Sequence, residues 1–152
     1  MAIEDTINLL QALNQGITGI PPGAAPALTN YPTVIDFTPF VITWPADGSW
    51  YIKGAASKQA LRTYRVICFV ESLGVNDIPS RAVEAVQLLQ RFIDAYITAA
   101  NVAQADPPTY QVTIESGPDT PHTDGGLISS LTFGGKAYHG FELRIGVREY
   151  WL

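Results

Sequence analysis

The clearest pattern in the sequence is the alternation in residues 138–152 (YHGFELRIGVREYWL). Apolar residues recur at every second position, which is the period of a strand with one buried face. The apolar set is Phe141, Leu143, Ile145 and Val147, and the alternating polar set includes Glu142, Arg144, Arg148 and Tyr150. Chain ends usually fray unless something holds them. We therefore predict that this segment is a central strand of a sheet or takes part in a contact with another subunit.

Other strands are predicted where β-branched and aromatic residues lie between turn sequences. The strongest is 61–71 (LRTYRVICFVE), which is apolar on both faces in its middle and is expected to be central. Residues 33–44 include Pro39, which cannot donate to a ladder, so they predict an edge strand or a bulged pair. Further strands are expected at 50–52, 109–115 and 127–133, with turns at 45–49 and at Gly134-Gly135.

Two segments have helical spacing. Residues 3–13 predict a short helix with acids in its first turn, and 78–102 predict a long one. Asn76 or Asp77 is the expected N-cap of the long helix. Its expected buried stripe is Ala82, Val86, Leu89, Ile93, Tyr96 and Ala100, opposite Arg81, Glu84, Gln87, Arg91 and Asp94.

This element order predicts a single α+β domain over residues 1–152. We expect a two-layer sandwich: a mainly antiparallel sheet with one long and one short helix on one face. Residues 16–32 (GITGIPPGAAPALTNYP) are rich in Gly and Pro and carry no charge. They are either a surface loop or an arm lying along a neighbouring subunit.

Composition favours contacts with other protein over binding to nucleic acid. Charged residues make up 15% of the chain, against about 25% in typical domains. Subunit contacts are one explanation, and a small neutral domain is the other. The net charge is −5 and no basic residue precedes Lys53, so no clustered basic face is predicted. The single cysteine, Cys68, and the absence of a cationic leader or a bilayer-spanning apolar run lead us to expect a protein that folds in a reducing cytoplasm.

Candidate catalytic and metal sites are weak. Asp119, His122 and Asp124 could bind a metal, but their spacing matches no closed motif and their loop is rich in turn residues. A dyad of Cys68 with His122 or His139 would require a partly exposed thiol, whereas Cys68 lies in an apolar strand. We predict a protein that is not an enzyme and that has no cofactor or metal.

The order and spacing of several segments resemble a known family. These segments are the N-terminal helix, the Pro/Gly loop, a strand ending in Trp44, YRVICFVES, SRAVEAVQLLQRFIDAY and the closing YHGFELRIGVREYW. Together they resemble the tail terminator proteins of long-tailed bacteriophages and related tail-completion and neck proteins. The resemblance covers most of the chain and rests on hydrophobic pattern and element order, without a diagnostic motif.

The resemblance implies a structural virion protein, assembled in the host cytoplasm. Such a protein forms a ring, usually hexameric, that caps the tail tube, stops its polymerisation and meets the neck or head-completion proteins. DNA would pass through the ring without specific binding, and no membrane is involved. The expected subunit interface includes Glu142, Arg144, Arg148, Tyr150 and Trp151, opposite the long helix or the uncharged arm. The expected tube or neck contacts are Lys53, Lys58, Asp119, His122 and Asp124.

Two other classes of function remain open. A head-closure protein or tube subunit has a similar size and pattern. A cytoplasmic α+β enzyme or ligand-binding domain would instead require a concave pocket with converging polar groups.

Overall fold

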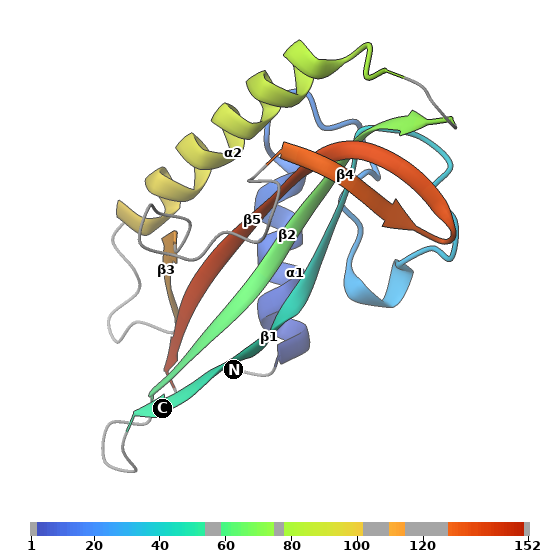
Figure 1. Ribbon diagram of the computed structural model, residues 1–152. Helices are drawn as coiled ribbons and strands as arrows, with labels where there is room; N and C mark the ends of the chain where they lie inside the picture. Colours follow the sequence, from blue (N-terminus) through green and yellow to red (C-terminus); the bar gives the residue numbers. More distant parts are fainter. Residues whose placement is uncertain (1–2, 54–58, 75–77, 102–109, 115–127, 151–152) are drawn as a thin grey trace.

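The structure, a computed structural model, describes residues 3–53, 59–74, 78–101, 110–114 and 128–150 (Figure 1). In chain order its elements are α1 (Ile3–Gln15), the short 3₁₀ helix η1 (Leu28–Asn30), β1 (Phe40–Lys53), β2 (Gln59–Leu73), α2 (Ala82–Asn101), β3 (Tyr110–Ile114), β4 (Ile128–Phe133) and β5 (Lys136–Tyr150). The described chain combines two α-helices with one antiparallel sheet, which confirms the predicted α+β class.

The sheet is built around β2 and β5. The strand order is β1-β2-β5-β3, and β4 pairs with the first part of β5. β2 lies between β1 and β5, while β5 pairs with β2 on one side and with β4 and then β3 on the other. Both predicted central strands are therefore central. Because β5 has partners along both sides, the sheet holds the C-terminal segment as far as Tyr150.

The alternation of β5 is confirmed by burial. Phe141, Leu143, Ile145 and Val147 are fully buried on the face toward the helices, whereas Glu142 and Arg144 are half-buried on the other face. Gly140 is required by the approach of β5 to β2, because a Cβ there would lie 1.9 Å from the backbone oxygen of Cys68.

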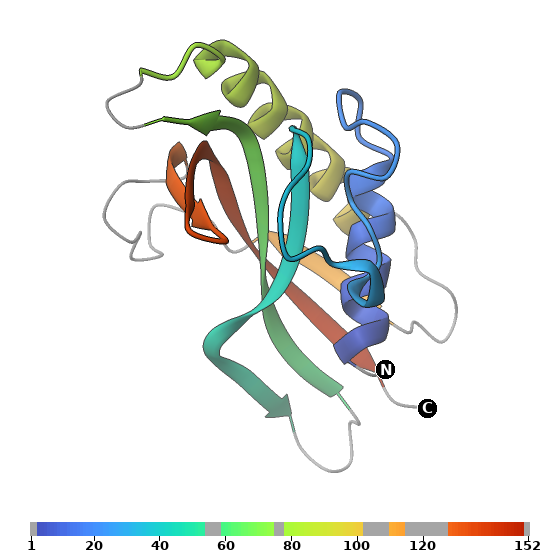
Figure 2. The same ribbon diagram turned by 90° about the vertical axis from the view of Figure 1, so that its right-hand side faces the viewer.

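Both helices lie on one side of the sheet, as Figure 2 shows. α2 buries Ala85, Leu88, Phe92 and Tyr96 completely, and the rings of Phe92 and Phe141 meet edge to face at 5.1 Å. The predicted buried stripe is correct at Tyr96 and in part at Leu89 and Ile93, which pack against the core, but it is wrong at Ala82 and at Val86, which is 55% exposed. Apolar residues occupy more than half of the circumference of α2, so periodicity alone did not determine which of them faces the sheet.

β1 differs most from the prediction. Residues 33–39 are not in a strand, and β1 begins only at Phe40. The expected turn at 45–49 is also wrong, because β1 continues through it, with a register shift between Pro45 and Trp50. An edge strand tolerates such a bulge and a proline because its outer side needs no ladder partner. β1 is an edge strand in this sheet, as predicted.

The segment 16–32 packs on its own domain. Ile17, Ile20, Ala24 and Ala25 belong to the hydrophobic core. Side chains of α1 hold the segment in place: Gln15 donates to the carbonyl of Pro21 (2.7 Å) and accepts from the backbone N–H of Ala25 (3.0 Å), and Asn8 accepts from the backbone N–H of Leu28 (2.9 Å). The segment therefore packs against α1 and β1 of its own subunit, and several of its apolar side chains are part of the core.

A buried hydrogen-bond network joins the two helices to β1. Tyr96 of α2 donates its hydroxyl proton to Asn14 of α1 (2.6 Å). The amide of Asn14 donates to Gln11 (3.0 Å) and to the hydroxyl of Thr43 in β1 (3.2 Å), and that hydroxyl donates to Gln11 (2.8 Å). All four side chains are at most 1% exposed.

Gln11 extends the network to the backbone. Its amide nitrogen donates to the carbonyls of Pro26 and Val41, at 2.9 Å in both cases. Every amide hydrogen and amide oxygen of Gln11 and Asn14 thereby has a partner. A fully satisfied polar network can be buried at little cost, whereas an incomplete one destabilises the fold.

The N-terminus of α2 is held by a residue at the end of β2. The carboxylate of Glu71 accepts from the backbone N–H groups of Ser80 (3.1 Å) and Arg81 (2.9 Å) and from the hydroxyl of Ser80 (2.5 Å). These hydrogen bonds lower the pKa of Glu71. The expected caps Asn76 and Asp77 lie outside the described residues.

We expect Tyr96→Phe to lower the free energy of unfolding by about 1–3 kcal/mol, because the buried oxygen of Asn14 loses its only donor among the described contacts. Urea denaturation of Tyr96→Phe, Asn14→Ala and the double variant measures the coupling between the two side chains. If the free-energy losses of the two single variants add up to the loss of the double variant, the two side chains are not coupled and the network is contradicted.

We expect Glu71→Gln to cost about 1 kcal/mol at neutral pH, since the charged cap is lost. The lowered pKa means that the contribution of Glu71 is present above its ordinary pKa of 4.5 and is lost as the pH falls below that value. Thermal unfolding between pH 7 and pH 3 should show the difference from wild type shrinking toward low pH. Asp36→Asn, at an exposed position, is the matched control.

Candidate functional site: an apolar groove on the sheet

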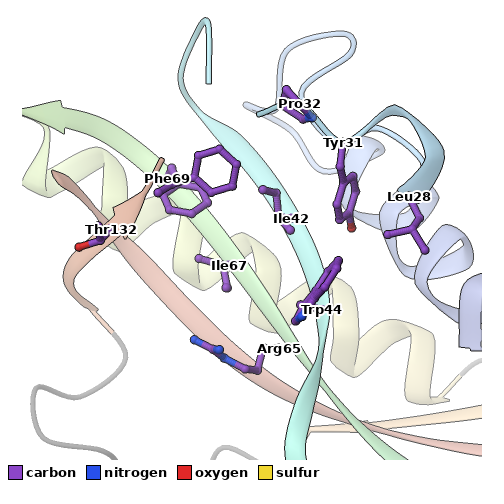
Figure 3. A pocket seen from close by; sticks show the side chains of 10 residues that line it. Leu28, Tyr31, Pro32, Ile42, Trp44, Arg65, Ile67, Phe69 and Thr132 are labelled. Carbon is purple, nitrogen blue, oxygen red and sulfur yellow. The ribbon is translucent and has the colours of Figure 1, made fainter. Parts of the chain in front are cut away.

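The face of the sheet away from the helices carries a groove of about 500 Å³ (Figure 3). Ile42, Ile67 and Phe69 form its floor. One wall comes from the segment around η1 and the other from β4, while Trp44 and Arg65 lie at one end. The wall residues are Leu28, Tyr31 and Pro32 on one side and Thr132 and Phe133 on the other.

Strand alternation creates this groove. In the register of β1 and β2, Ile42 is opposite Ile67 and Trp44 is opposite Arg65, so these side chains share a face. β4 reaches the same face because a tight hairpin joins it to β5. The turn residues Gly134 and Gly135 have φ angles of 57° and 79°, which confirms the predicted hairpin and explains the two glycines.

Tyr31 fixes one wall of the groove to the edge of β1. Its hydroxyl donates to the carbonyl of Thr43 (2.7 Å) and accepts from the backbone N–H of the same residue (3.0 Å). Burial raises the pKa of Tyr31 to about 12, although the hydrogen bond from the Thr43 backbone acts in the opposite direction. The ring of Tyr31 also lies 6.1 Å from that of Trp44, centre to centre.

The outer edge of β1 is closed next to this wall. The N–H of Val41 donates to the carbonyl of Ala24 (2.8 Å), and the carbonyl of Val41 accepts from Gln11. Because the hydroxyl of Tyr31 bonds to the backbone of Thr43, the outward N–H and C=O groups of Val41 and Thr43 all have partners within the chain. An incoming strand therefore cannot pair with these two residues, whereas the apolar face of the groove beside them is uncovered.

Arg65 and Glu142 form an ion pair beside the groove. The guanidinium contacts both carboxylate oxygens, with Nη2 of Arg65 3.1 Å from Oε2 of Glu142. The side chains are 37% and 24% exposed, so solvent screens much of the attraction. Arg144 is opposite Arg65 in the strand register and half-buried. The predicted interface residues Glu142 and Arg144 thus border the groove.

A second uncovered apolar surface lies on α2. Val83, Val86 and Ile97 are 72%, 55% and 46% exposed, and Ile93 between them is half-buried. These four residues, which we call the outer stripe, lie along one side of α2, and the exposed polar residue Gln90 interrupts them between Val86 and Ile93. The outer stripe points away from the sheet, because Phe92 and the other buried residues of α2 face it.

The remaining predicted contact residues cannot be placed in a site. Lys58, Asp119, His122, Asp124 and Trp151 lie outside the described residues. Lys53 ends β1, and Arg148 and Tyr150 pair in β5, but only their backbones are described. The sequence analysis did not predict the groove. The signal for it was the pair of apolar residues Ile67 and Phe69 on the outer face of a central strand.

Cys68 is buried, as predicted. Burial raises the pKa of its thiol, in contrast to the lowered pKa and partial exposure that reactive cysteines have. Within the part of the chain that the structure describes, no cluster of three His, Cys, Asp or Glu residues could hold a metal ion. Neither described helix has the length and apolarity that crossing a membrane requires.

Comparison of the chain with protein-family models, with curated proteins and with solved structures gave no match.

We expect Tyr31→Phe to lower the free energy of unfolding by about 1 kcal/mol at neutral pH, because the Thr43 backbone loses its partner. In the wild type, the raised pKa of Tyr31 contributes stability that is fully present below pH 10.0 and is lost as the pH rises toward about 12. The difference between variant and wild type should therefore shrink above pH 10 in urea denaturation. A difference that stays constant to pH 12 would contradict this assignment.

Proposed function

We propose that this protein is a structural subunit of a bacteriophage tail, of the tail terminator class. In this proposal it forms a homomeric ring, hexameric as is usual in the family that it resembles. The ring caps the tail tube, stops its polymerisation and joins the tail to the neck. The observation that carries the proposal is the pair of uncovered apolar surfaces, the groove and the outer stripe, on opposite sides of one subunit.

A subunit with two different contact surfaces is better suited to a ring than to a dimer with twofold symmetry. A dimer with twofold symmetry uses the same patch on both subunits, and a closed ring joins two different patches head to tail. Exposed apolar patches of this kind usually mark contacts with other protein. The predicted interface residues Glu142 and Arg144 border one of these surfaces, which supports their role at a subunit contact.

The position of β5 also suits a subunit contact. β5 pairs with β2 along its length and with β4 and β3 near its two ends, so a contact made by its face is held by the centre of the sheet. The net charge of −5 is compatible with a channel through which DNA passes without binding, because phosphates are not attracted to an acidic wall. The tube protein and a neck protein would be the other partners, in the virion.

Tail length tests this proposal. We expect phage particles made without this protein to show tubes of irregular and excessive length that lack heads, and normal tails to return when the wild-type gene is supplied. Electron microscopy measures both. Normal tail lengths in its absence would exclude the terminator role.

The assembly of the purified protein separates the terminator from its closest alternative. Light scattering should show a discrete closed oligomer. Unlimited filaments would instead identify a tube subunit, and a monomer at all concentrations would favour a ligand-binding domain that uses the groove. Its volume of about 500 Å³ lies within the roughly 300–1,000 Å³ of small-molecule sites.

A further inference from the structure

We draw no further inference here: the strongest candidate, the apolar groove between the segment around η1 and β4 on the outer face of the sheet, carries none because nothing in the structure shows what covers it.

Discussion

The buried hydrogen bonds among Gln11, Asn14, Thr43 and Tyr96 are the constraint on which the rest of the structure depends. They connect α1, β1 and α2 at one point in the core, and through the carbonyl of Pro26 they also hold the segment 16–32. Apolar contacts alone would let a helix slide or rotate with modest loss, because the hydrophobic effect has no direction. Hydrogen bonds that leave no buried group unsatisfied allow one arrangement, and every other arrangement costs the desolvation of amide groups.

That arrangement determines which surfaces remain uncovered. Because Tyr96 must face Asn14, the side of α2 that carries Leu88 and Phe92 is turned toward the sheet, and Val83, Val86 and Ile97 are left outside. The same network holds residues 16–32 beside β1, where Tyr31 closes the strand edge and forms a wall of the groove. Stability and the proposed contact surfaces therefore have a common origin.

A subunit with a closed edge and two apolar surfaces is limited in how it can associate. Pairing through the outer edge of β1 is prevented at Val41 and Thr43, where the backbone groups already have partners. Association through side chains on two different surfaces forms a ring when the rotation between neighbouring subunits closes, and a filament when it does not. Pairing of exposed strand edges has no such closure and permits open-ended growth.

The sequence by itself determined the elements whose patterns are local. The alternation of β5, the doubly apolar β2, the glycine hairpin and the two helices follow from periodicity and turn chemistry, and they were sufficient for the α+β class. Only the tertiary structure decided which side of α2 is buried, that β1 continues through Pro45, and that Glu71 caps α2 from another element. It also decided that Leu28, Ile67 and Thr132 meet in one groove. These features depend on partners distant in the chain, and an apolar or amide side chain has no local signal for the partner that it will meet.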